Sequence, residues 1–125
     1  MTEKARNITG WILTGLISIV FIASAIMKLK GGEEIVKATE AMGISLGVFK
    51  MLGVIELVSV VLFIIPRTGL LGTLLLTAYL GGAIATHLEH QQSVLTPVII
   101  ESLLWITATI RFPELSKRLL GYKST

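Results

Sequence analysis

The stretch "MLGVIELVSVVLFIIP", residues 51–66, is apolar enough to lie in lipid, yet it carries the acid Glu56 near its middle. A helix needs about 20 mostly apolar residues to cross a bilayer. The apolar run around this stretch extends over residues 48–65. We therefore predict a membrane-spanning helix there, and Glu56 becomes the residue that needs an explanation.

Composition indicates a membrane protein along the whole chain. Of the 125 residues, 53% are hydrophobic and only 15% are charged, whereas soluble domains have about 25% charged residues. The mean hydropathy is +0.81. The absence of Cys excludes disulfides and thiolate metal sites, and we predict no metal site. No basic cluster interleaved with aromatic residues indicates nucleic-acid binding.

Three further apolar runs cover residues 10–29, 68–88 and 94–111. All four are too long and too uniformly apolar for the alternating strands of a membrane barrel. We predict an all-α fold, a single integral membrane domain over residues 1–125 that forms a four-helix bundle in contact with the lipid bilayer.

A cleaved signal peptide is the alternative for the first run. Lys4 and Arg6 precede it, and Ala23–Ala25 resembles a cleavage site. Because the apolar run continues through residue 29, we favour a membrane helix.

The connections add two shorter segments. Residues 33–43 have the spacing of an amphipathic helix on the outer surface, with an ordinary solvated loop as the alternative. After Pro113, leucines and basic residues indicate a short segment at the inner surface, where anionic headgroups attract it.

Lys and Arg set the orientation, because they concentrate in cytoplasmic flanks. With both termini inside, seven of these residues are cytoplasmic, namely Lys4, Arg6, Arg67, Arg111, Lys117, Arg118 and Lys123. The outer side then has four, namely Lys28, Lys30, Lys37 and Lys50. We predict that both termini are cytoplasmic.

Polar side chains of different spans fall at one depth. At about 1.5 Å of rise per residue, Glu56 lies roughly 12 Å, Glu101 roughly 10 Å and Tyr79 roughly 13 Å from the outer ends of their helices. His87 follows Tyr79 on the same helical stripe, nearer the outer mouth. Lys28 ends the first span at that mouth.

These five residues are the candidate site. A charged side chain that faces lipid costs at least about 2.5 kcal/mol, so both acids should face inward. We predict a polar pocket between the helices, open to the outer side. Two arrangements stay open: a protonated acid that donates to Tyr79 or to a backbone carbonyl, or a positive partner such as Lys28 or His87. The alternative is that the polar groups only join helices, by hydrogen bonds worth about 0.6–2 kcal/mol each.

Two rows of small residues mark the third span. They are Ala78, Gly82 and Thr86, and Thr77, Gly81 and Ala85. Such rows let helix backbones approach closely, which predicts a central third helix, with a homo-oligomer contact as the alternative.

Several motifs resemble those of one family. They are "KL" at 28–29, "GVIEL" at 53–57, "PRTGLLG" at 66–72 and "YLGGAIATHL" at 79–88. With these motifs the chain resembles the DoxX-like four-helix membrane proteins over nearly its whole length. Where that family usually has a Gly shortly before "KL", this chain has Ser24-Ala25-Ile26-Met27.

The resemblance implies a protein of the bacterial or archaeal cytoplasmic membrane. It also implies that Lys28, Glu56 and His87 occupy the family's recurrent polar positions. Some relatives are associated with quinone-linked sulfur oxidation or with oxidative-stress complexes, and most have no assigned activity.

Three functions are consistent with the sequence. The first is binding of a quinone or a similar lipophilic small molecule, or service as a subunit of a membrane redox complex. The second is proton-coupled transport, as in small multidrug exporters, although those carry their essential carboxyl in the first helix. The third is a purely structural assembly role. Nothing in the chain carries electrons, so we predict no independent catalytic activity and no catalytic residue.

Overall fold

Helices make up nearly all of the structure. The computed structural model describes residues 2–121, and Lys123, which the charge count placed inside, lies outside them. The described residues form α1 (Glu3–Lys30), α2 (Glu33–Met42), α3 (Leu46–Ile64), the 3-10 turn η1 (Pro66–Thr68), α4 (Gly69–Glu89), α5 (Leu95–Arg111) and α6 (Pro113–Leu120). No strand occurs between residues 2 and 121, so the predicted all-α class is confirmed.

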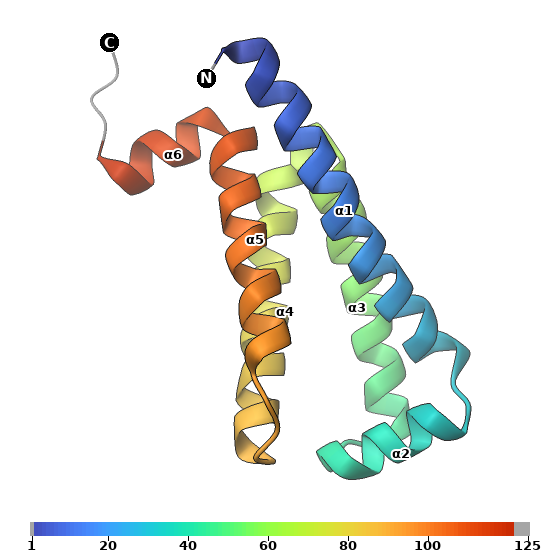
Figure 1. Cartoon of the computed structure of the whole chain (residues 1–125). Helices are drawn as coiled ribbons and strands as arrows, with labels where there is room; N and C mark the ends of the chain where they lie inside the picture. The colour runs from blue at the N-terminus through green and yellow to red at the C-terminus, as the bar shows by residue number, and fades with distance from the viewer. Residues whose placement is uncertain (1, 122–125) are drawn as a thin grey trace.

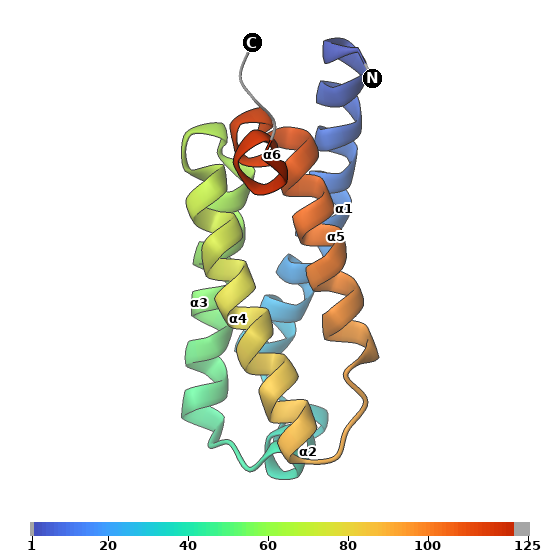
Figure 2. The ribbon, with the colours of Figure 1, turned by 90° about the vertical axis from the view of Figure 1, so that its left-hand side faces the viewer.

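The four long helices pack as a ring. α1 packs against α3 and α5, and α4 packs against the same two helices. The start of α1 lies at the same end of the molecule as α6, and α2 lies across the opposite end (Figure 1). Figure 2 shows the same arrangement from the side, with α4 between α3 and α5. We call these two ends the α6 end and the α2 end.

The helix boundaries agree with the predicted runs to within two residues, except at the start of α1. There the helix begins at Glu3 because the Thr2 hydroxyl caps it, accepting from the Ala5 N–H at 3.1 Å. α1 continues without a break through Ala23–Ala25. Residues 33–42 form the amphipathic helix α2 rather than a loop, and Gly43 ends it with a left-handed φ of 67°.

Apolar side chains cover the outside of the bundle. α1, α3 and α4 with its preceding turn are each long and apolar enough to cross a membrane. The shorter α5 bends by 110° into α6, and the pair is a fourth candidate. Exposed examples, one from each long helix, are Ile19, Met51, Leu74 and Ile106. An apolar surface of this extent is typical of proteins that contact lipid.

Hydroxyl groups bond within their own helices. Thr14, Ser59, Thr73 and Thr107 each donate to the carbonyl four residues earlier, at 2.7–2.9 Å. These four side chains are buried inside the bundle, so each takes its hydrogen-bond partner from the backbone of its own helix.

Glycine sets the contact between α3 and α4 near the α6 end. A Cβ added at Gly72 would lie 2.2 Å from the Phe63 amide nitrogen, so the two backbones touch almost directly there. From this contact the helices diverge toward the α2 end (Figures 1 and 2). The small-residue rows do not supply the contact, because a Cβ at Gly81 or Gly82 would have no neighbour within 4 Å. The prediction that these rows bring backbones together was wrong.

Arg111 ties three helices together at the α6 end. Its guanidinium donates to the carbonyls of Phe63 and, at 2.8 Å, of Ile64. These are carbonyls of the last turn of α3, which lack partners within the helix. The same guanidinium lies 4.5 Å from the centre of the Trp11 ring on α1. The positive charge of Arg111 therefore contributes to packing between α1, α3 and α5.

A methyl group at residue 72 tests the backbone contact. We expect Gly72→Ala to lower the free energy of unfolding by about 1–3 kcal/mol, because overpacking moves the backbones apart. The matched control is Gly81→Ala on the same helix, which has open space and should be neutral or stabilising. Thermal unfolding in detergent micelles, followed by circular dichroism, measures both. Equal stability of the two variants would contradict the close contact.

Candidate functional site

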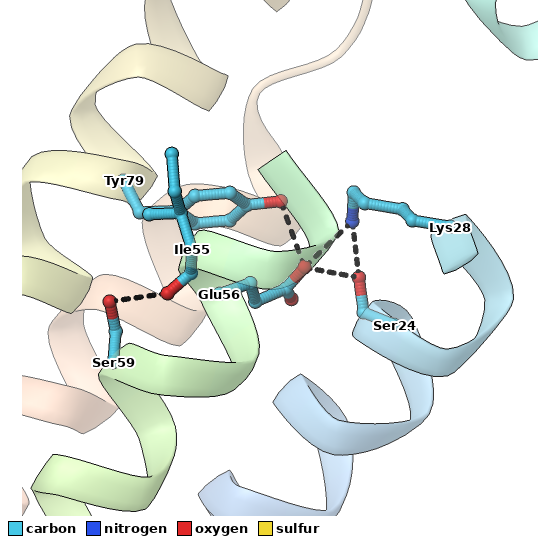
Figure 3. A network of polar contacts seen from close by, with 6 residues as sticks. All are labelled: Ser24, Lys28, Ile55, Glu56, Ser59 and Tyr79. Atoms are coloured by element: carbon cyan, nitrogen blue, oxygen red, sulfur yellow. Dashed lines mark hydrogen bonds and ion pairs between the residues drawn. The ribbon is translucent and has the colours of Figure 1, made fainter. Parts of the chain in front are cut away.

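A single buried carboxylate joins three helices. Glu56 on α3 is only 1% exposed. Its Oε2 accepts from Lys28 Nζ at 2.9 Å, from the Tyr79 hydroxyl at 3.1 Å and from the Ser24 hydroxyl at 3.3 Å (Figure 3). Lys28 and Ser24 come from α1 and Tyr79 comes from α4. We call these four residues the Glu56 cluster.

The close approach of α1 to α3 positions the cluster. Gly53 lies three residues before Glu56 and shares its buried face of α3. A Cβ at Gly53 would lie 3.0 Å from Lys28 Cβ and 3.3 Å from the Ala25 carbonyl oxygen. Because α1 comes this near, Ser24 and Lys28, four residues apart on one face, both reach the Glu56 carboxylate.

The Lys28 ammonium has bonding capacity left. It donates to Ser24 Oγ at 2.6 Å and to Glu56 Oε2 at 2.9 Å. An ammonium group has three donors, and the third has no hydrogen-bond partner among the described residues. The rings of Phe49 and Tyr79 lie 5.4 and 5.6 Å from Nζ, which adds cation–π attraction.

A pocket of about 410 Å³ lies beside the cluster, toward the α2 end. It is lined by Lys28, Met42, Ile44, Phe49, Leu52, Ile55, Leu75, Ala78, Tyr79, Gly82, Ala83, Thr86 and His87. Most of these side chains are apolar, and the polar groups are few and local. The sequence predicted a polar pocket open at the outer end, whereas this pocket is mainly apolar, with Met42 and Ile44 at its α2 end.

The imidazole of His87 presents one free nitrogen. Its Nδ1 lies 2.6 Å from the Ala83 carbonyl oxygen. A carbonyl only accepts, so Nδ1 carries the hydrogen of this bond. Nε2 has no hydrogen-bond partner within residues 2–121 and is able to accept from a ligand, or to donate when the ring is charged.

The structure brings together four of the five candidate residues. Lys28, Tyr79 and His87 line the pocket, and Glu56 lies directly behind the first two. Glu101 does not line it, is half-buried on α5, and makes no hydrogen bond or ion pair with any described residue. α5 packs against α1 and α4, so Glu101 sits across the ring from the α3 helix that carries Glu56.

Sequence reasoning missed two residues of the site. Ser24 was named only within the stretch before "KL", although its spacing of four from Lys28 places both on one helical face. Gly53 was quoted only within a motif. Its spacing of three from Glu56 was the available signal, but the partner helix it faces is not visible in one chain.

Removing the lysine tests the ion pair. We expect Lys28→Met to destabilise the protein by about 3 kcal/mol, because it leaves a buried carboxylate without its counter-charge. The double variant Lys28→Met/Glu56→Gln should recover most of that loss, since no charge is then buried. Lys30→Met, at an exposed position of the same helix, is the control. Unfolding midpoints in micelles of the unmodified protein, of Lys28→Met and Glu56→Gln singly and of the double variant give the coupling energy. Strictly additive losses would contradict the pair.

The family of the chain follows from comparison with known proteins. No curated protein and no solved structure matches the chain. Residues 12–108 match the DoxX-like family, a range that contains the Glu56 cluster, the pocket and all four long helices in whole or in large part. The chain therefore belongs to the DoxX-like family.

Proposed function

We propose that the chain is a multi-pass protein of the bacterial or archaeal cytoplasmic membrane, in which α1, α3, α4 and α5 form a four-helix transmembrane bundle. The length of α5, 17 residues, corresponds to about 26 Å at 1.5 Å per residue, close to the hydrocarbon thickness of about 30 Å. The excess of Lys and Arg toward the α6 end supports a cytoplasmic location for that end and for both termini.

We further propose that the pocket binds a quinone or a similar lipophilic molecule with a hydrogen-bond-accepting head. The observation that carries this proposal is the mainly apolar lining of a 410 Å³ pocket around one free Lys28 donor. Ligand pockets typically have volumes of about 300–1,000 Å³ and a few convergent polar groups. The ammonium of Lys28 would donate to one head-group oxygen, and Nε2 of His87 would donate to a second one when the imidazole ring is charged.

The Glu56 cluster would hold the polar end of this pocket in place. A lysine chain has many rotamers, and ordering it at a ligand costs conformational entropy. Here Ser24 and Glu56 already fix the ammonium before a ligand arrives, which lowers that cost. The carboxylate, the phenol of Tyr79 and the imidazole can pass protons, whereas electrons for quinone chemistry would come from a partner subunit of a redox complex.

Proton-coupled transport of a small molecule is the second candidate. The observation that favours it is a buried carboxylate in an apolar segment, since such groups mark proton pathways in transporters. Proton-driven uptake into liposomes that is lost in Glu56→Gln would support transport over binding alone. If the Glu56→Gln variant changes only stability, a purely structural role is the better account.

Two histidines, His87 in the last turn of α4 and His90 directly after the helix, provide a matched test of ligand binding. His87 and His90 both bond through Nδ1 to the carbonyl four residues earlier, but only His87 lines the pocket. We expect His87→Leu to weaken quinone binding about 3- to 10-fold, the value of one polar contact, and His90→Leu to leave it unchanged.

Tritiated quinone binding to the purified protein in nanodiscs, with protein-free nanodiscs as the blank, measures this difference. Glu101→Gln is a second control, because that residue lies outside the pocket. Absence of binding by the unmodified protein, or equal losses in the two histidine variants, would contradict the proposed site.

A further inference from the structure

One side wall of the pocket lies on the outside of the bundle. Ile55 on α3 and Leu75 on α4 line the pocket and are 44% and 38% exposed. Ala78 and Gly82, which also line it, are exposed as well. In a membrane-spanning bundle, exposed apolar residues at this level face acyl chains. The pocket therefore borders lipid between α3 and α4.

Nothing fills the gap on the α4 side of this wall. A Cβ at Gly82 would have no atom within 4 Å, and the neighbouring wall residue Ala78 has only a methyl group. α3 and α4 already diverge here, because their backbone contact at Gly72 is near the other end (Figure 1). The small side chains thus leave a lateral opening rather than a packed seam.

The route from water is more obstructed. At the α2 end the pocket is lined by the half-buried Met42 and Ile44, from α2 and the link that follows it. Between them, Gly43 approaches the end of α4 so closely that a Cβ there would lie 3.2 Å from Nε2 of His90. The link therefore covers the end of the pocket that faces water.

The lining of the pocket is polar on its inner wall and apolar on the side that faces lipid. Its inner wall has the ammonium of Lys28 and the phenol of Tyr79, whereas Ile55, Leu75 and Gly82 line the lipid side. A ligand that matches both the polar inner wall and the apolar lipid side has a hydrogen-bond-accepting head and an apolar tail.

We infer that the pocket takes its ligand sideways from the bilayer, through the α3–α4 opening, and that the ligand is a membrane-dissolved amphiphile whose tail stays between Ile55 and Gly82. This inference rests on the proposed binding function and adds to it the route of entry and the position of the ligand's tail. Water-soluble molecules of the same head chemistry fit the inner part of the pocket but make no use of the opening.

Adjacent glycines of α4 allow a matched test. Gly81 and Gly82 both have open space around them, but only Gly82 lines the pocket. The probes are an isoprenoid quinone with a long tail and the same quinone ring without a tail, each tritiated. Equilibrium binding is measured for the full chain in nanodiscs, and circular dichroism confirms that each variant is folded.

We expect Gly82→Leu to weaken binding of the tailed quinone by about tenfold or more, the scale on which a filled apolar pocket rejects a ligand, and to change binding of the tailless ring less than about twofold. Gly82→Ala should give an intermediate loss, and Gly81→Leu should give none. The inference is overturned if Gly82→Leu binds the tailed quinone as the unmodified protein does, or if it weakens both probes equally. If the unmodified protein binds neither probe, the proposed binding function is wrong. That result differs from one in which the protein binds quinone but the α3–α4 opening has no effect on binding of the tail.

Discussion

The ion pair between Lys28 and Glu56 is the interaction on which the rest of this structure depends. A carboxylate inside an apolar bundle is tolerated only with a counter-charge and hydrogen bonds, and α1 supplies both through Lys28 and Ser24. Tyr79 adds a donor from α4. Three helices are thereby fixed to one atom, and the helix spacing that results leaves a pocket next to the ammonium.

The two ends of the bundle are built differently, and this difference creates the pocket. Near the α6 end, Gly72 brings α4 against the backbone of α3, and Arg111 caps the last carbonyls of α3. Toward the α2 end, Gly53 instead brings α3 against α1. α3 thus has α4 as its close neighbour at one end and α1 at the other, so that α3 and α4 separate where the pocket lies.

The sequence predicted the helices well because their signal is local. The length of an apolar run can be read without knowledge of the neighbouring helices. The pairing of helices is not local, which explains the errors at the site: depth alone put Glu101 level with Glu56, but α5 lies across the ring from α3. Likewise, Gly81 and Gly82 each belong to a row of small residues four apart, yet both face open space. The close contacts between helices are instead made at Gly72 and Gly53.

The distance between the lysine ammonium and the glutamate carboxylate tests the central interaction most directly. Solid-state NMR of the protein in lipid bilayers, with ¹⁵N in lysine side chains and ¹³C in glutamate carboxyl groups, measures the dipolar coupling between Nζ and Cδ. With Nζ 2.9 Å from Glu56 Oε2, we expect one strong coupling that is absent from both Lys28→Met and Glu56→Gln. A spectrum without that coupling in the unmodified protein, or with one that survives either substitution, would contradict the ion pair.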